Sequence, residues 1–518
     1  MNWIPLLLLL SLFTSPYRTD TPPKDPIQVQ LLTINDYHGK LNQTYKFSNP
    51  PNQKAGRADY LSTYFQAYEN PNAHTIKVQA GDVIGASAPV SALFHDEPTV
   101  EIFNYLGFSY GTVGNHEFDK GVLELLRMVY GGNELTRENQ QPYPGIAWET
   151  LCANCIWKET GQTLFPPFAV TEIEGVKLGF IGVITQDTED LVAKGGVEGL
   201  YFSDPTAEVN KAVKELKKQG VRAIVILAHM PATQDGNVVT GQAADLATGV
   251  DDEVDVILAA HNHQVVNGTV DNKLIVQALN YGKAFGDIEL LLDPLTGDVL
   301  EKSAEVIYVD QAKIKPDPVV TKMIQSYEGA SSEVLDQVVG QAAEDIVGGS
   351  LGNFIADGMK QVMDSDFALV NSGGIRDSIK KGKVTYEDIL AIHPFQNNLV
   401  KLTVTGKELQ EILNAQITPN KGPDFSVAGF TYTWNNKTKK VESILLNEGT
   451  RIKPDRSYTI AVNSFMADSD APMFQLIGKY GKDKTIGPTD TEALAEFISS
   501  FPQPITYSTD DRIQVVSK

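Results

Sequence analysis

Five short apolar segments constrain the fold of this chain more than any other feature, because each is followed at once by a loop rich in Asp, Asn or His. The segments that predict strands are 27–34, 75–79, 110–113, 221–228 and 254–260. Helical patterns such as 59–68 and 207–218 lie between several of them. Alternating strands and helices predict a layered α/β core. Ligands in such folds sit at the carboxyl ends of the strands, so we expect the five loops to meet at one site.

The loops carry side chains that suit two divalent metal ions. They are Asp36, His38, Asp82, Asn115, His116, His229, His261 and His263. The chain has only 8 His, and a lone His is usually a hydrogen-bonded structural residue. We keep that interpretation for His74, His95 and His393, whereas five His placed at strand ends indicate ligands. Mixed oxygen and nitrogen ligands favour Zn, Mn or Fe over Ca or Mg.

Length and charge limit the classes of function. A chain of 518 residues is too long for one compact core, so two or more domains are expected. Its 43 Lys and Arg against 65 Asp and Glu give a net charge of −22. This acidity argues against a nucleic-acid clamp and against a polybasic membrane anchor. An anionic substrate would therefore need a local source of positive charge.

The two ends and the two cysteines add a few expectations. The apolar run 4–13 is too short to span a bilayer and predicts a secretory signal, with residues 1–22 as signal and tether. The alternative is a hydrophobic, disordered terminus. We expect a secreted protein, periplasmic or extracellular, without a transmembrane anchor. Cys152 and Cys155 fit a local disulfide or two buried thiols equally well, and a strand conformation would oppose the bond because side chains three apart point to opposite faces.

The loop motifs resemble the signature of a known enzyme family. Asp36-x-His38, Gly81-Asp82, Gly114-Asn115-His116-Glu117, His229 and His261-x-His263 are similar to the dimetal, calcineurin-like metallophosphoesterases. Gly114 to Asp119 further resembles the secreted 5′-nucleotidase branch, although Ala260 stands where that family usually has Gly. The resemblance implies a four-layer β-sandwich flanked by helices over residues 27–308.

The resemblance also implies roles for these residues. Metal one would bind Asp36, His38, Asp82 and His263, and metal two would bind Asp82, Asn115, His229 and His261. Water activated by the metals would attack phosphorus. His116 would stabilise the phosphoryl group or protonate the leaving oxygen, and Asp119 would orient His116. The alternative for Asp119 is a carboxylate at the start of the next helix.

The pattern changes near residue 310. Asp317 and Pro318 predict the N-cap and first residue of a helix, which we place in a linker over 309–335. A second α/β unit is expected over 336–518, with a helix at 351–363 and a strand at 367–370 that leads into a Gly-rich loop.

This second unit resembles the C-terminal, nucleotide-binding domain of 5′-nucleotidases in the segments 371–376, 393–397 and 404–409. By that resemblance Phe395 and Phe465 would sandwich the base, and Arg376 would meet phosphate. Asn371, Asn397 and Asp470 would hydrogen-bond ribose or base. The segment 344–350 is acidic where the family often carries Arg, and 468–470 reads Asp-Ser-Asp where the family has Gly-Gly-Asp. We therefore expect a weaker phosphate clamp and a preference for monophosphates or cyclic esters.

Together these features predict a secreted, metal-dependent 5′-nucleotidase that hydrolyses nucleoside 5′-phosphates and brings base and metals together by domain rotation. The alternatives are a UDP-sugar diphosphatase and a 2′,3′-cyclic-nucleotide 2′-phosphodiesterase with 3′-nucleotidase activity. A non-enzymatic binding protein is disfavoured because every predicted ligand and His116 are present. Oligomeric state, metal identity and preferred nucleotide are left open by the sequence.

Overall fold

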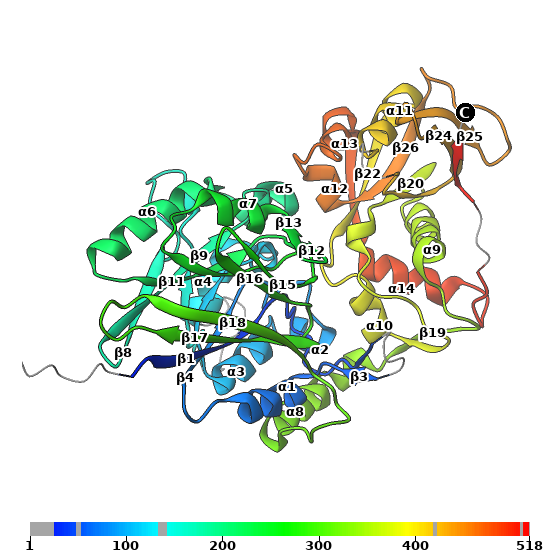
Figure 1. The fold of residues 1–518 in the computed structure, drawn as a ribbon. Helices are drawn as coiled ribbons and strands as arrows, with labels where there is room; N and C mark the ends of the chain where they lie inside the picture. The colour runs from blue at the N-terminus through cyan, green and yellow to red at the C-terminus, as the bar shows by residue number, and fades with distance from the viewer. Residues whose placement is uncertain (1–24, 48–52, 133–141, 418–421, 508–510, 517–518) are drawn as a thin grey trace, which may run out of the picture.

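The computed structural model describes residues 25–47, 53–132, 142–417, 422–507 and 511–516. The predicted signal segment lies outside them. Two six-stranded sheets form the first half of the molecule (Figure 1). The first sheet has the order β18 (Val299–Tyr308), β17 (Ala284–Leu292), β1 (Ile27–Ile34), β4 (His74–Gln79), β5 (Phe108–Thr112) and β6 (Glu149–Leu151). The second has the order β15 (Val265–Val270), β16 (Lys273–Ala278), β14 (Val254–Leu258), β11 (Ala223–His229), β9 (Val176–Ile184) and β8 (Phe168–Ile173).

The two sheets pack face to face because their strands are apolar on both sides. In β1, Leu31 points into the core between the sheets, whereas Leu32 points to the helices outside. In β11, Val225 and Ile226 divide in the same way. Strands buried on both faces are typical of parallel sheets covered by helices, and β1, β4, β5 and β6 are indeed parallel, as are β9, β11, β14 and β16.

Helices complete four layers and confirm the predicted sandwich. The helices α1 (Ala58–Tyr68), α3 (Glu97–Leu106) and α8 (Pro318–Leu335) cover the first sheet, and α6 (Pro205–Lys218) and α7 (Gln242–Gly249) cover the second. Shorter elements join these layers: β2 (Tyr45–Lys46), β3 (Lys54–Ala55), α2 (Pro89–Ala92), η1 (Asn115–Phe118), α4 (Val122–Tyr130), β7 (Cys155–Trp157), α5 (Thr188–Leu191), η2 (Lys194–Val197), β10 (Leu200–Phe202), β12 (Thr233–Asp235) and β13 (Val238–Thr240).

The second half is built on a five-stranded sheet. Its order is β23 (Ser426–Ala428), β20 (Phe367–Val370), β26 (Ser457–Asn463), β22 (Asn398–Thr405) and β27 (Lys482–Thr489). The helices α9 (Gly348–Val362) and α14 (Asp490–Ser500) cover one face, and α11 (Gly406–Ala415), α12 (Ser464–Asp468) and α13 (Gln475–Tyr480) cover the other. The remaining elements are β19 (Val338–Ala342), η3 (Ser372–Gly374), β21 (Gly382–Thr385), α10 (Tyr386–Ile392), β24 (Phe430–Asn435), β25 (Lys440–Leu446) and β28 (Ile513–Val516).

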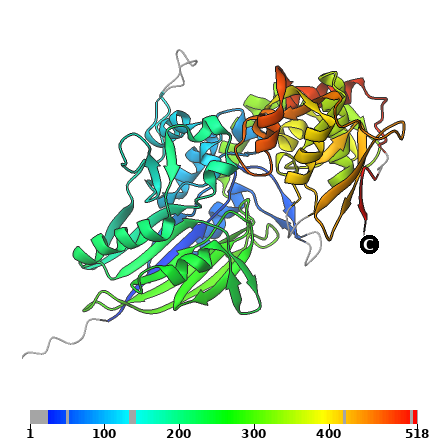
Figure 2. The ribbon, with the colours of Figure 1, turned by 90° about the horizontal axis from the view of Figure 1, so that it is seen from above.

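The helix α8 links the two halves. The Asp317 side chain accepts hydrogen bonds from the backbone N–H groups of Val319 (2.8 Å) and Val320 (3.4 Å), as an N-cap residue does. Val320 and Ile324 are buried in the core that covers the first sheet, and α10 of the second half packs against α8 and α2. Figure 2 shows the second half set to one side of the sandwich, and Figure 1 labels α2 and α10 close together where the two halves meet. Within the described chain, none of the helices combines the length and apolar character that crossing a bilayer requires.

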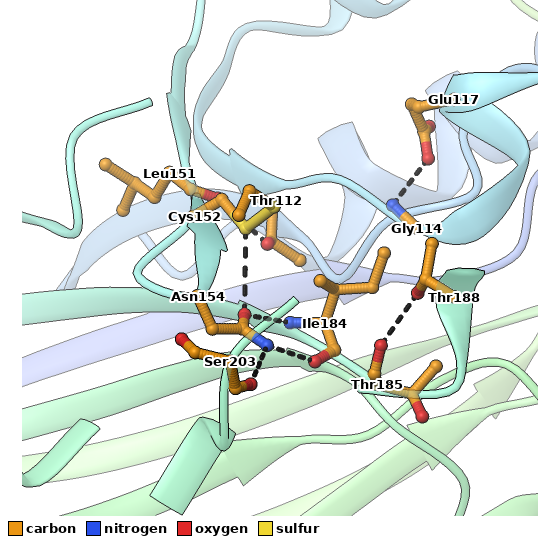
Figure 3. Close-up of a disulfide and its surroundings, with 11 residues drawn as sticks. Thr112, Gly114, Glu117, Leu151, Cys152, Asn154, Ile184, Thr185, Thr188 and Ser203 are labelled. Atoms are coloured by element: carbon orange, nitrogen blue, oxygen red, sulfur yellow. Dashed lines mark hydrogen bonds between the residues drawn. A yellow bond between two sulfur atoms is a disulfide. The ribbon is translucent and has the colours of Figure 1, made fainter. Parts of the chain in front are cut away.

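The two cysteines form a disulfide, which resolves the alternative that the sequence left open (Figure 3). A continuous strand through both cysteines would have opposed the bond. Instead, β6 ends at Leu151 and β7 begins at Cys155, so a turn brings the two sulfur atoms together. Asn154 stabilises this turn, because its side chain bonds to the backbone N–H of Ile184 (3.0 Å) and the carbonyl of Ile184 (2.8 Å).

Candidate active site

All seven predicted metal ligands lie together at the carboxyl ends of five strands. β1, β4 and β5 are neighbours in the first sheet, and β11 and β14 are neighbours in the second. The loops after these strands therefore meet where the two sheets end. The residues that they supply are Asp36, His38, Asp82, Asn115, His229, His261 and His263.

The side chains form two separate groups that each could hold a metal ion, and a third group links them. Asp36, His38 and His263 make one group, and Asp82, His229 and His261 make the other. The linking group, His38, Asp82 and His116, shares one residue with each; within each of the three, the ligand atoms lie within 4.8 Å of one another. One oxygen of Asp82 lies 3.6 Å from His38 Nε2 and 3.2 Å from His229 Nε2. Asp82 thus faces both groups, as a bridging carboxylate must.

The Asn115 amide completes the second group. Its Oδ1 lies 3.0 Å from His261 Nδ1. A neutral amide oxygen in this place gives that group two imidazoles, one carboxylate and one amide. This mixture suits a transition metal or zinc.

The buried imidazoles test whether the residues fit metal ions. His38 Nδ1 lies 2.9 Å from the Gly85 carbonyl, and His229 Nδ1 lies 2.9 Å from the Ala80 carbonyl. Each ring therefore donates from Nδ1, and Nε2 is the atom that could bind a metal ion. Burial lowers the pKa of His229, but the nearby Asp82 carboxylate raises it more, to about 9, so a metal ion would displace a proton from His229 Nε2. Both Nε2 atoms are buried without a hydrogen-bond partner. A ligating His held by a backbone carbonyl at its other nitrogen is the usual arrangement around a protein metal, so the residues fit.

Burial sets the protonation state of three of the four proposed imidazole ligands. It lowers the pKa of His38 far below the usual value and, with the charge of nearby His229, lowers the pKa of His261 to about 4. Burial and the charge of Arg376 lower the pKa of His263 to about 3. These three imidazoles are neutral at pH 7, as metal ligation requires.

The backbone at the site is strained. Asp36, His38, Asp82, His261 and His263 all have positive φ angles, between 51° and 79°. Such angles cost energy in residues with a side chain, and they cluster at functional sites. Ala260, which replaces the usual Gly, is outside this set, so its methyl group imposes no such strain.

Two glycines let the loops close on the ligands. Gly81 has a φ of +87°, and a Cβ there would lie 2.7 Å from His229 Nδ1. Gly114 has an ordinary φ of −103°. A Cβ at Gly114 would nevertheless overlap Asp82 Oδ1 and lie 2.6 Å from His229 Cε1. The motif glycines are thus required by the close approach of two ligands.

Sequence reasoning missed a buried carboxylate that ties two loops together. Glu117 accepts hydrogen bonds from the backbone N–H groups of Asp82 (2.9 Å), Val83 (2.8 Å) and Gly114 (2.6 Å). Figure 3 shows the bond to Gly114. Burial and the charge of Asp82 raise the Glu117 pKa to about 7. The signal that could have found it is its place in the Gly114–Glu117 motif.

Asn35 and Asn280 were also missed. The Asn35 amide donates to Asp36 Oδ2 (2.7 Å) and the Leu279 carbonyl (2.5 Å), and the Asn280 amide lies 2.9 Å from His263 Nδ1. Both orient a proposed ligand. The Asn35 bond to Leu279 joins positions 244 residues apart, and Asn280 lies 17 residues from His263, so no short sequence motif marks either contact.

His116 and Asp119 form the expected pair. His116 Nδ1 lies 3.0 Å from Asp119 Oδ2, and the same carboxylate oxygen accepts from the Ala86 N–H at 3.1 Å. Burial lowers the pKa of His116, but Asp119 and Asp82 raise it more, so the net shift is upward. Asp119 therefore contacts the imidazole, and Gly121, not Asp119, is the N-cap of the following helix α4.

The second half brings a ring onto this pair. Phe395, between α10 and β22, lies 5.7 Å from the His116 ring with an angle of 19° between the planes. The Arg376 guanidinium lies 5.8 Å from the Phe395 ring. Both residues thus reach the metal-ligand region from the other half of the chain.

The other predicted substrate residues lie around Phe395 and the end of β26. Asn371 Oδ1 accepts from Asn463 Nδ2 at 3.1 Å, and Asn397 Oδ1 accepts from the Ser464 hydroxyl at 3.4 Å. Phe465 follows directly and is half-buried, with its ring 5.3 Å from that of Phe474. Asp470 differs from the others, because its exposed carboxylate pairs with Lys194 of the first half at 2.8 Å.

The comparisons with known proteins agree with this geometry. The calcineurin-like phosphoesterase model matches residues 29–265, and the 5′-nucleotidase C-terminal domain model matches residues 329–476. The endonuclease YhcR of Bacillus subtilis is 46% identical over 96% of this chain. The cell wall protein Lmo0130 of Listeria monocytogenes is 33% identical over 92% of this chain and 67% of its own length. The chain spans only 42% of the Bacillus relative.

A solved structure shares the fold. The crystal structure of a 5′-nucleotidase precursor from Thermus thermophilus aligns with a TM-score of 0.79 at 24% identity, covering 95% of this chain and 99% of that one. A four-layer sandwich with two linked Asp and His clusters at its strand ends, matched by the calcineurin-like phosphoesterase model, defines a metallophosphoesterase, a phosphoric ester hydrolase. With the second matched domain, the chain belongs to the 5′-nucleotidase family.

Proposed function

We propose that this chain is a secreted 5′-nucleotidase that hydrolyses nucleoside 5′-phosphates to nucleoside and phosphate. The contact that carries the proposal is the Phe395 ring lying over His116 at 5.7 Å. A base stacked near Phe395 would have its 5′ oxygen close to an imidazole that can donate a proton. This is the geometry that a nucleotidase needs, since the leaving group is the nucleoside.

The seven strand-end ligands are proposed to hold two divalent ions, Zn, Mn or similar. When bound, such ions lower the pKa of water and polarise phosphoryl oxygens. They also supply the local positive charge that an acidic chain lacks. Glu117 would keep the loops of Asp82 and Asn115 in register through its backbone hydrogen bonds.

His116 is proposed to protonate the leaving oxygen or to stabilise the phosphoryl group. Asp119 would hold the imidazole proton at Nδ1, so that Nε2 faces the substrate. Because Asp119 also accepts from the Ala86 N–H, its carboxylate is fixed in place. The pair thus has one fixed orientation.

The base would stack between Phe395 and Phe465. Neither ring belongs to the fully buried core, and both are half-buried. Stacking of this kind tolerates different bases. Arg376 would contact phosphate, while Asn371 and Asn397 would contact ribose or base. Asp470, already paired with Lys194, is the weakest of the proposed contacts.

Catalysis and substrate binding are proposed for different parts of the chain. We propose residues 27–308 as the catalytic domain, 309–335 as the linker and 336–518 as the substrate-binding domain. Export, with residues 1–22 as signal, is supported by the cell wall relative. The endonuclease name of the Bacillus relative is not carried over, because that protein is more than twice as long and the net charge of −22 opposes a nucleic-acid clamp.

Hydrolysis of AMP and of glycerol 2-phosphate, with and without chelator, tests the proposal. We expect metal-dependent hydrolysis of both. Phe395→Ala should lower kcat/KM for AMP by about 5- to 150-fold, because it removes about 1–3 kcal/mol of stacking. For glycerol 2-phosphate, which has no base, kcat/KM should stay within threefold. Chelator-insensitive hydrolysis, or equal losses on both substrates, would reject it. A UDP-sugar or a 2′,3′-cyclic nucleotide as the far better substrate would favour the alternative activities.

A further inference from the structure

His393 begins the loop that carries Phe395, and it has no role so far beyond that of a hydrogen-bonded structural residue. This loop, 393–397, joins α10 to β22, whereas the loop that carries Arg376, 371–376, follows β20. β20 and β22 are not neighbours in the sheet, because β26 lies between them. The two loops therefore need contacts of their own to hold Phe395 and Arg376 in one arrangement.

Hydrogen bonds join the two loops, and one of them comes from the imidazole of His393. Its Nδ1 lies 3.1 Å from the Gly374 carbonyl oxygen, and the Arg376 N–H donates to the Ile392 carbonyl oxygen at 3.0 Å. The Arg376 guanidinium lies 5.8 Å from the Phe395 ring. The groups proposed to bind phosphate and base are thus neighbours where the loops are bonded to each other.

The imidazole of His393 is enclosed and makes this bond in a defined tautomer. The residue is 3% exposed. A carbonyl oxygen only accepts hydrogen bonds, so the proton lies on Nδ1, and the Asp490 carboxylate, 3.9 Å from Nδ1, is a second acceptor on that side of the ring. Among the described residues, the buried Nε2 has no hydrogen-bond partner. An unpaired buried nitrogen costs stability, so the use of a histidine here indicates that the Gly374 bond matters.

The start of α14 fixes both ends of the Phe395 loop. The Asp490 N–H donates to the Asn397 carbonyl oxygen at 2.8 Å, and the Thr491 hydroxyl donates to the His393 carbonyl oxygen at 3.3 Å. Asp490 and Thr491 are themselves buried. The loop is therefore anchored to the rigid part of the second half, and His393 extends this anchoring to the neighbouring loop.

The backbone next to Phe395 is strained. Gln396 has a φ of +52°. Such an angle costs energy in a residue with a side chain, and such residues cluster at functional sites. The Phe395 ring is only half-buried, so the conformation of the loop sets its direction more than core packing does.

We propose that His393 is a positioning residue whose bond to Gly374 sets Phe395 relative to Arg376, so that the stacking ring and the phosphate-binding cation meet the substrate as one unit. The inference rests on the proposed function, which places the base at Phe395 and the phosphate at Arg376. A purely structural imidazole would support turnover equally with or without the aromatic ring. A positioning imidazole acts through that ring.

Variants that keep or lose the donor at Nδ1 test the inference. His393→Asn keeps an N–H donor at the place of Nδ1, whereas His393→Leu has nearly the same size and no donor. His393→Gln moves the donor to the place of Nε2 and is the second variant without the Nδ1 bond. His74→Leu is the matched control, because His74 is exposed and pairs with Glu174 in the first half. The measurements are kcat/KM for AMP, with and without Phe395→Ala, and hydrogen exchange of the backbone amides in the two loops.

We expect His393→Leu and His393→Gln to lower kcat/KM for AMP about 10-fold, as the loss of one buried hydrogen bond does, and to speed exchange in both loops. His393→Asn and His74→Leu should stay within threefold, with unchanged exchange. In the Phe395→Ala background, His393→Leu should change kcat/KM by less than threefold, because the ring that it positions is gone.

Equal kcat/KM in the Asn and Leu variants, or the same loss with and without the Phe395 ring, would overturn the inference. Unchanged exchange in the Gly374 loop of His393→Leu would overturn it as well. If His393→Leu does not fold, His393→Gln gives the same comparison. If the unmodified chain fails to hydrolyse AMP, the proposed function falls, whereas exchange in the two loops still decides whether His393 couples them.

Discussion

Gly114→Ala isolates the close approach on which the metal site depends. Gly114 has φ −103° and ψ −174°, an extended conformation that alanine adopts without strain. The new methyl group would overlap Asp82 Oδ1 and lie 2.6 Å from His229 Cε1 and 2.7 Å from Asp82 Cγ. Ordinary contacts of a Cβ begin near 3.4 Å. The substitution must therefore move the Asp82 carboxylate, the His229 ring or both.

The size of the effect follows from that displacement. Extra atoms in a packed site cost about 1–3 kcal/mol of folding free energy, so the variant should still fold. A misplacement of about 1 Å at a reacting centre costs about 100-fold in rate. We expect Gly114→Ala to lower metal affinity at least 10-fold and AMP hydrolysis about 100-fold. Calorimetric metal titration, thermal unfolding of the metal-free chain and steady-state kinetics give the three values.

Gly195→Ala is the matched control, because a Cβ added at Gly195 would meet no atom within 4 Å and the residue has no positive φ. It should leave metal affinity and turnover within threefold. If Gly114→Ala behaved like this control, the tight packing of the strand-end loops would not be what positions Asp82 and His229, and the reasoning would be refuted.

Three further predictions follow from other contacts. Asp119→Asn should lower kcat about 10- to 100-fold with little change in KM or metal content, because Asp119 acts through the orientation of His116. Burial raises the pKa of Asp255 to about 6, so Asp255→Asn should be stabilised relative to the unmodified chain by up to about 2–3 kcal/mol. This gain should appear as pH rises from about 4 to about 6, where the unfolded carboxyl has ionised and the folded one has not. Replacing Cys152 and Cys155 by Ser should cost about 2 kcal/mol, as expected for a short closed loop, without changing metal content.

Each of these has a control and a contrary outcome. Glu149→Gln, at an exposed position on β6, should leave kcat unchanged, and an unaltered kcat in Asp119→Asn would remove its positioning role. Asp235→Asn, at an exposed position on β12, should show no stabilisation across the same pH range in urea titrations. A pH-independent gain in Asp255→Asn would contradict the assigned cause. Loss of metal from the Cys variant would mean that the turn supports the site.

The fold was predictable where strands run into loops of unusual composition. The strands 27–34 and 367–370 begin and end as predicted. The convergence of the ligands follows from the order of the strands, since β1, β4 and β5 are neighbours. Local pattern and the general rule for strand ends were enough for these features.

Other features depend on contacts between distant segments, which local patterns do not encode. The bond from the Asn35 amide to the Leu279 carbonyl and the stacking of Phe395 on His116 are examples. The cysteine pair was left open because the sequence did not reveal that β6 ends before Cys152.

The central claim is that one chain holds two metal ions at its strand ends and uses them on a nucleotide. The most direct test is the metal content and AMP hydrolysis of the same purified preparation, for the unmodified chain and for Asp82→Asn. We predict about two metal ions per chain and hydrolysis that chelator abolishes and added metal restores, with both metal content and activity reduced in the variant. Full activity in a preparation without metal, or full metal content and activity in Asp82→Asn, would contradict the account.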